Sequence, residues 1–485
     1  MCDIYLEVGE TDYPSDEYGF SPSKHYPEYP WDTYSIPHNN NSVYEMVRNC
    51  LIGLEMDTEN VGNRNWNPFK NLISDGDTVI LKPNWVLHVN ENKQVKENAL
   101  DCLVTHPSIV RTICDFCIIA LNGTGKIIIG DAPMQGCDLQ ELLNITGYNK
   151  MLDFYKERNA DVSFCDFRKY ISVLDKNKII IDKVYTDQVC IDVELGNNSM
   201  HYSKNSDKQY QVSDYDKELT NKYHQNEKHC YSINQNILKA DVVINICKPK
   251  CHRLAGITGA LKNIVGITCG KACLPHRTLG SKEEGGDEYL NRSYIKKIIS
   301  EVLSQKVKYE NEKKPKRALL MRYIYIVLYY WVKIFKKDKY LIGSWYGNDT
   351  IWRTVLDLNT ILLYADKAGK IRNTTQRKVF NFADMIVSGE RNGPVSPSPK
   401  KIGIILASYN SVFMDRVICE IMGLDYKKIP GLESAINNTR LTHQLSKNIQ
   451  IKSNVSNYCT NVEEVVFQKE WKFTPYDSWI GNIEK

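Results

Sequence analysis

The chain has 485 residues, of which 42% are hydrophobic and 25% are charged. These fractions are typical of folded globular proteins and exclude a wholly disordered chain. The 62 Lys and Arg residues nearly balance the 58 Asp and Glu residues, which leaves a net charge of only +4. We therefore expect no nucleic-acid partner, because non-specific binding to DNA or RNA needs a strongly basic surface.

The first twenty residues are acidic and polar, with neither a basic stretch nor an apolar run. We therefore expect no secretory signal and a cytoplasmic location. The 15 cysteines are too sparse for a disulfide-rich scaffold. In a reducing compartment most of them are expected to be free thiols in the core.

Residues 1–42 are rich in Tyr, Pro, Ser and Asn and show no hydrophobic period, which predicts an irregular N-terminal arm. After residue 42, segments with helical spacing alternate with short apolar runs. The predicted order is a helix at 43–56, a strand at 79–81, a helix at 106–122, a strand within 123–136 and a helix at 138–155. This alternation predicts an α/β fold with a mostly parallel sheet and flanking helices.

The second half of the chain returns to the same pattern after a weaker stretch at 169–237. Further elements are expected as strands at 178–185, 189–195, 240–247, 383–388 and 401–410, as helices at 350–366 and 411–424, and as a tight loop or closely packed helix at 255–271. We predict one large α/β domain over 43–435, with an inserted helical segment at about 280–345. Residues 436–485 are predicted to be a C-terminal extension.

Residues 318–335 are almost continuously apolar and aromatic, with four basic residues near each end. The run is shorter than the roughly 20 residues that a spanning helix needs, and it contains Arg322. One interpretation is a helix on a membrane surface, with its lysines toward anionic lipid. The other is a buried helix under a basic rim.

Polar residues follow the predicted strands at the points where the strands end. Because ligands bind beyond the carboxyl ends of strands in open α/β sheets, we expect a site for an anionic small molecule there. Candidate substrate-binding residues are Lys82, Asn84, Lys248, Lys250, Lys262 and Asn263. Candidate catalytic residues are His252 and His106 as acid or base, with Asp131 or Glu390 orienting the histidine or binding a divalent metal. The alternative for any single junction is that Pro and Gly only end the strand and the lysine is solvated.

Trp352 and Arg353 are two further substrate-binding candidates in the segment 343–359. An indole ring stacks on a sugar face, and a guanidinium grips phosphate or carboxylate with two hydrogen bonds. The alternative is a packed helix start that Asp349 or Thr350 caps.

Cysteines and histidines cluster between Cys247 and His276, and thiolate and imidazole are zinc or iron–sulfur ligands. The weak metal candidates are Cys251, Cys269, Cys273 and His276. Both cysteine pairs have three intervening residues and no run of four cysteines exists, so no iron–sulfur cluster is expected. His88, His201, His224 and His229 lie in polar stretches and are predicted to be at the surface.

Six motifs follow one another in a fixed order: LKPN at 81–84, THP at 105–107, GDAP at 130–133, KPKCHRLAGITGALKNIVG at 248–266, GPVSPSP at 393–399 and ASYNSVFMDRVICEIMGLD at 408–425. Together they resemble the domain of unknown function 362 family, over about 75–435. The family's Lys-x-Lys-x-His motif, followed by Thr-Gly-x-x-Lys-Asn, is matched here by Lys248, Lys250, His252, Thr258, Gly259, Lys262 and Asn263. Cys251 replaces a residue that is commonly Thr.

The resemblance says little about activity, because the family's activity is largely unassigned. Some members carry a ferredoxin-like Cys-rich segment, which this chain lacks. Residues 343–359 look like a subgroup associated with surface-polysaccharide biosynthesis. A fainter similarity connects the stretch from Lys262 to His276 with nickel-dependent lactate racemase.

The leading hypothesis is a cytoplasmic enzyme that acts on an anionic, sugar-linked or phosphorylated substrate, with the reaction type left open. One rival is a non-catalytic scaffold of a glycan assembly system, anchored to the inner face of the membrane by residues 318–335. Another is a metal or redox protein that uses the Cys247–His276 cluster. The oligomeric state is not predicted.

Overall fold

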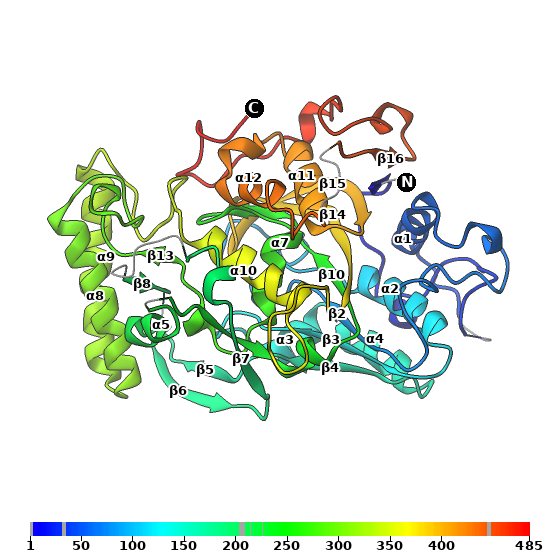
Figure 1. Ribbon diagram of the computed structural model, residues 1–485, viewed down its shortest axis with the longest axis horizontal. Coiled ribbons are helices and arrows are strands. Elements are labelled where there is room, and N and C mark those ends of the chain that lie inside the picture. The colour runs from blue at the N-terminus through cyan, green and yellow to red at the C-terminus, as the bar shows by residue number, and fades with distance from the viewer. Residues whose placement is uncertain (1–2, 32–34, 203–208, 214, 226, 444–447) are drawn as a thin grey trace.

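The computed structural model describes residues 3–31, 35–202, 209–213, 215–225, 227–443 and 448–485 (Figure 1). In this part of the chain a central sheet has the strand order β16-β1-β15-β14-β10-β2-β3-β4, and β11 and β12 extend it beside β14. Its strands are β1 (Ile4–Val8), β2 (Thr78–Lys82), β3 (Lys126–Asp131), β4 (Val162–Asp166), β10 (Val242–Cys247), β11 (Lys250–His252), β12 (Gly256–Thr258), β14 (Lys378–Asn392), β15 (Ser396–Ser408) and β16 (Ile451–Ser453). The predicted α/β class is confirmed.

The strands β14, β10, β2, β3 and β4 form a parallel block. Beside them, β15 runs antiparallel to both β14 and β1. Parallel strands end at the same edge of a sheet. This edge therefore carries Lys82 at the end of β2, Asp131 at the end of β3 and Asp166 at the end of β4.

Helices cover both faces of the parallel block, which explains why its strands are apolar on both sides. Val79, Leu81 and Ile244 pack with α1 (Ser42–Gly53), α2 (Pro107–Leu121) and α4 (Tyr148–Lys156) on one face. On the other face, Ile80 and Val243 pack against α10 (Ile351–Tyr364). Helices α11 (Ser411–Ile421) and α12 (Pro430–Ile436) extend this second core. Figure 1 shows α7 (Ala260–Asn263), α10, α11 and α12 together on that side.

Smaller elements lie around the central sheet. The remaining helices are α3 (Leu139–Ile145), α5 (Lys217–Tyr223), α6 (Gln235–Lys239), α7 (Ala260–Asn263), α8 (Tyr294–Asn311) and α9 (Pro315–Phe335). Three two-stranded sheets pair β5 (Tyr170–Leu174) with β6 (Ile180–Tyr185), β7 (Cys190–Glu194) with β9 (Cys230–Asn234), and β8 (Tyr210–Gln211) with β13 (Arg277–Thr278). The strands expected at 178–185 and 189–195 are therefore present, but outside the central sheet.

Three local predictions need correction. The prediction of an irregular arm is wrong at residues 4–8, because these residues form β1, which lies in the central sheet between β15 and β16. The helix expected at 138–155 is two helices, since Gly147 has a φ of 84° and ends the first. The predicted loop after residue 388 is still strand, because β14 continues beside β15 to Asn392.

The predicted helical insertion consists of α8 and α9, which form a hairpin at one end of the molecule (Figure 1). The hairpin has its own small core, in which Ile299, Val332 and Leu341 are buried. Among the described residues, α9 is the one helix long and apolar enough to cross a membrane by length and composition, and 11% of its most apolar window is buried. The alternative of a buried helix is therefore wrong.

Candidate functional site

A buried ion pair joins the ends of two neighbouring strands. Lys82 Nζ donates to Asp131 Oδ1 at 2.8 Å, and both side chains are almost inaccessible to solvent. Asp131 also accepts the backbone N–H of Trp85 at 2.7 Å and that of Ala132 at 2.9 Å. A buried carboxylate is stable when it is paired and hydrogen-bonded in this way. The loops after β2 and β3 are thereby fixed to one carboxylate.

Side-chain amides extend this network across the sheet edge. Asn263 Oδ1 accepts from Asn84 Nδ2 at 2.7 Å, and Asn263 Nδ2 donates to Asn245 Oδ1 at 2.8 Å. Lys250 Nζ donates to Asn84 Oδ1 and to the carbonyl of Leu103, each at 2.6 Å. Lys82, Asn84, Lys250 and Asn263 therefore belong to one network, which we call the edge network together with Asp131. Satisfied buried networks of this kind hold their members in one arrangement.

Gly266 allows the segment after α7 to lie against the edge network. Its carbonyl accepts the N–H of Ala132 at 2.9 Å. A Cβ at this position would collide with Asp131 Oδ1 and would lie 2.7 Å from Lys82 Nζ. Glycine is required here for close approach to the ion pair.

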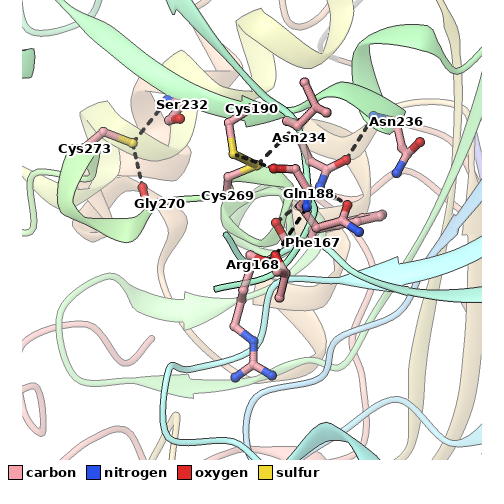
Figure 2. The surroundings of a disulfide bond; sticks show 12 residues. Phe167, Arg168, Gln188, Cys190, Ser232, Asn234, Asn236, Cys269, Gly270 and Cys273 are labelled. Carbon is pink, nitrogen blue, oxygen red and sulfur yellow. Dashed lines mark hydrogen bonds between the residues drawn. A yellow bond between two sulfur atoms is a disulfide. The ribbon is translucent and has the colours of Figure 1, made fainter. Parts of the chain in front are cut away.

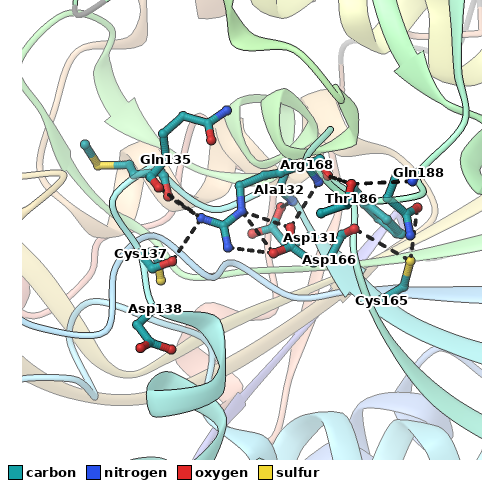
Figure 3. A network of polar contacts seen from close by, with 12 residues as sticks. Asp131, Ala132, Gln135, Cys137, Asp138, Cys165, Asp166, Arg168, Thr186 and Gln188 are labelled. Atoms are coloured by element: carbon teal, nitrogen blue, oxygen red, sulfur yellow. Dashed lines mark hydrogen bonds and ion pairs between the residues drawn. The ribbon is translucent and has the colours of Figure 1, made fainter. Parts of the chain in front are cut away.

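Arg168 fixes the loop that follows Asp131 (Figure 3). Its Nε donates to both carboxylate oxygens of Asp166, and its Nη2 donates to Asp166 Oδ2 at 2.6 Å. Its Nη1 reaches the carbonyls of Met134 at 2.8 Å and Cys137 at 3.0 Å. Arg168 is completely buried, and its hydrogen bonds fix the loop at 131–138 to the end of β4.

A group of basic side chains lies next to the edge network. We call Arg253, Lys262 and Lys271, with His252 and His276, the cationic cluster. Burial, and then the charges of Lys271 and Lys82, together lower the pKa of Lys262 to about 7. Lys271 donates to the Ala132 carbonyl at 2.6 Å, and burial lowers its pKa to about 8. Among the described residues, no acceptor is within hydrogen-bond distance of the side-chain amine of Lys262.

The two histidines of the cationic cluster are fixed as opposite tautomers. His252 Nδ1 accepts the N–H groups of Leu254 and Ala255, each at 3.1 Å, so the ring proton is on Nε2. His276 Nδ1 lies 2.6 Å from the Leu274 carbonyl and must donate, so its Nε2 carries a lone pair. Burial and then the charge of Lys262 lower the pKa of His276 to about 3 and that of His252 well below its usual range. Both rings are therefore neutral at pH 7.

Lys248 and His106 lie in a separate polar group with complete local partners. Lys248 Nζ is 2.7 Å from Asp384 Oδ2 and donates to Tyr13 Oη at 2.7 Å. The backbone N–H of His106 donates to the same carboxylate at 2.9 Å, and its ring stacks on Tyr13 with centroids 3.9 Å apart. Burial lowers the pKa of His106 to about 3. These contacts account for both residues without a ligand.

Three further candidates make their described hydrogen bonds away from the cationic cluster. Glu390 accepts the N–H of Thr474 at 2.9 Å. Trp352 Nε1 donates to Asp349 at 3.0 Å, and Arg353 donates to the Asp349 carbonyl at 3.0 Å. The last two contacts are those of a packed helix start. A role of these residues in substrate binding or catalysis stays a prediction.

The predicted metal cluster is not assembled. Cys269 forms a disulfide with Cys190, their Cα atoms 6.0 Å apart, so it offers no thiolate (Figure 2). Over the residues that the structure describes, no three His, Cys, Asp or Glu side chains are grouped to hold a metal ion. The described residues therefore do not bring the weak candidates Cys251, Cys269, Cys273 and His276 together as a ligand set. Burial raises the pKa of Cys251 and Cys273 to about 12, as in a protein core.

Three histidines predicted at the surface are buried together. His201, His224 and His229 are at most 3% exposed, and their ring centroids lie 5.6–5.9 Å apart. His224 Nε2 lies 2.8 Å from the Cys273 carbonyl, to which it donates. Burial lowers the pKa of His224 to about 3 and that of His229 to about 4. The surface prediction is wrong because polar neighbours in sequence do not imply exposure.

A family model described as Domain of unknown function (DUF362) matches residues 79–194 and 199–420. The chain belongs to the DUF362 family. No curated protein matches it. The match includes every residue of the edge network and of the cationic cluster, together with the α8–α9 hairpin.

The sequence missed Arg253, Lys271 and Arg168 as site residues of this DUF362 protein. Arg253 directly follows the Lys-x-Lys-x-His motif, and this position next to the motif could have marked it as a candidate site residue. Lys271 lies among small residues after Gly266 and Arg168 lies beyond β4, where nothing local marks them. Three-dimensional contacts with the segment after β3 place Lys271 and Arg168 at the site.

Proposed function

We propose that this DUF362 protein is an enzyme that acts on a small anionic substrate held by the cationic cluster. The observation that carries the proposal is Lys262, a partly buried amine with no acceptor among the described residues, whose pKa the charges of Lys271 and Lys82 lower. Burying like charges together is unfavourable unless an anion compensates them. Phosphate and carboxylate groups are the anions that lysine and arginine bind.

The carboxylates of Asp131 and Asp166 already have partners. Both oxygens of Asp131 already accept hydrogen bonds, from Lys82 Nζ, Ala132 N–H and Trp85 N–H. Asp166 is engaged by Arg168 in the same way. The excess positive charge at Lys262 and Lys271 is therefore left for a ligand.

The cationic cluster also holds groups suited to moving protons. With a pKa of about 7, Lys262 is half neutral at pH 7, and a neutral amine is a base and a nucleophile. Neutral His252 presents an Nε2–H that donates to a substrate oxygen, and His276 presents an Nε2 lone pair that accepts a proton. Acid–base chemistry beside a bound anionic group is the reaction class that these residues support.

Sugar phosphates are the substrates that we propose first, since residues 343–359 resemble a subgroup associated with surface polysaccharides. Thermal-shift measurements with phosphate, pyrophosphate, sugar phosphates and acetate test this. We expect phosphorylated compounds to raise the melting temperature of the wild type but not of Lys262→Met. Lys282→Met is the matched control, because Lys282 is an exposed lysine outside the cationic cluster. Equal shifts in the wild type and Lys262→Met would reject the site.

A further inference from the structure

Helix α9 carries a continuous exposed apolar face. We call it the α9 stripe, and its side chains are between 41% and 68% exposed. They are Leu320, Tyr323, Val327, Tyr330, Trp331, Ile334 and Phe335. Steps of three and four residues place side chains on one side of a helix. Folded monomers rarely leave a contiguous apolar face of this length uncovered.

The opposite face of α9 is occupied by its own hairpin. Val332 is completely buried against α8, in a core with Ile299 and Leu341. Tyr325, Leu328 and Tyr329 pack around the same core. Helix α8 therefore packs on the other face of α9 and does not cover the α9 stripe. A helix that crosses a bilayer would have to give up this packing.

Charge indicates what covers the α9 stripe. No acidic residue occurs between positions 313 and 337, whereas basic residues stand at both ends of the helix. Lys336 and Lys337 are exposed just beyond its end, and the Lys336 ammonium lies 5.6 Å from the Trp331 ring. An apolar face with Tyr and Trp between two basic ends is typical of helices that lie at an anionic lipid interface.

A second copy of the chain fits less well. In a symmetric pairing through the α9 stripe, either end of one helix meets a basic end of the other, whichever way the two helices run. Like charges brought together oppose association. An anionic surface meets both ends favourably.

We propose that the α9 stripe docks this protein on an anionic membrane surface, with α9 lying parallel to it. The Tyr and Trp rings would sit at headgroup level and the terminal lysines would meet anionic headgroups. This attachment uses no residue of the cationic cluster and does not depend on the proposed function.

Flotation with vesicles tests the proposal on the full chain. We expect it to float with vesicles of phosphatidylcholine and phosphatidylglycerol, less at high salt, and not with phosphatidylcholine alone. The double variant Val327→Ser with Ile334→Ser should bind the vesicles at least about tenfold more weakly than the wild type, because two exposed apolar side chains leave the interface. The matched control is Val189→Ser with Val466→Ser, which changes two exposed valines elsewhere and should float like the wild type.

A second pair of changes separates charge from apolar contact. Lys336→Gln with Lys337→Gln should weaken binding about thirtyfold, since each basic residue at an anionic surface contributes a factor of about five. Urea unfolding confirms that each variant folds. Equal flotation of the stripe variant and the wild type overturns the proposal. A second result would also overturn it: the wild type does not float, and sedimentation shows a dimer that the stripe variant abolishes. That result would assign the α9 stripe to contact with a second copy of the chain. Lys262→Met should float normally, so a failure of the anion site is distinguishable.

Discussion

Replacing Gly266 by alanine should destabilise the protein strongly through the edge network. The added Cβ would overlap Asp131 Oδ1 and lie 2.7 Å from Lys82 Nζ, so the ion pair at 2.8 Å must open. Both side chains are buried, and breaking a buried ion pair costs about 3–5 kcal/mol. We expect the free energy of unfolding to fall by about that amount. We also expect anion binding to weaken, because Gly266 lies between Lys262 and Lys271 on the same segment.

Urea unfolding of the wild type, Gly266→Ala and Gly270→Ala measures this effect. Gly270 is the matched control, because it is four residues further along the same segment and a Cβ there has no neighbour within 4 Å. The control should change the free energy of unfolding by less than about 1 kcal/mol. If Gly266→Ala is as stable as Gly270→Ala, the close packing of this segment on the Lys82–Asp131 pair is wrong.

Three further predictions concern charges in the core and in the cationic cluster. Asp384→Asn should lower the free energy of unfolding in urea by about 3–5 kcal/mol, because buried Lys248 would lose its carboxylate partner. Asp182→Asn, at an exposed pair with Lys313, should leave the stability almost unchanged. Below pH 6.5 the unfolded chain protonates its histidines while buried His224 and His229 stay neutral, so stability should fall by about 1.4 kcal/mol per pH unit for each ring. His224→Gln should remove one such contribution. At pH 7 trinitrobenzenesulfonate, which reacts with neutral amines, should label Lys262 (about half neutral) before Lys271 (about one-tenth neutral) and both before Lys282; mass spectrometry that finds Lys282 labelled first would contradict the lowered pKa values.

The parallel core could be predicted because its signals are local. Apolar runs at β2, β3 and β10 alternate with helical patterns, and the residues just after them are polar. The edge network follows from that order, since parallel strands end together. β1 was missed because a five-residue strand gives almost no periodic signal and its partners, such as Ser408, are some 400 residues away.

The burial of side chains at the site and the partners they contact could not be predicted from the sequence. His201, His224 and His229 have polar neighbours in sequence, yet their rings are buried against one another. The Cys190–Cys269 disulfide joins residues 79 apart that no spacing rule links. Lys248 and His106 follow strand and helix signals like the other candidates, but they contact Asp384 and Tyr13 and not the cationic cluster, and their role stays a prediction. Only three-dimensional contacts separate a lysine that has a partner from one, such as Lys262, that has no acceptor among the described residues.

Proton uptake on anion binding tests the central claim most directly. Sulfate, which does not titrate near neutral pH, should bind the cationic cluster and favour the charged form of Lys262, whose pKa in the free protein is about 7. At about pH 8, calorimetric titrations in buffers of different ionisation enthalpy should therefore show uptake of between about 0.9 and 1.4 protons for each sulfate bound, because Lys271, with a pKa of about 8, can take up part of a proton as well. Affinity should fall as the pH rises further, and Lys262→Met should remove most of the uptake. Sulfate binding without proton uptake, or unchanged uptake in Lys262→Met, would contradict the assignment of the site.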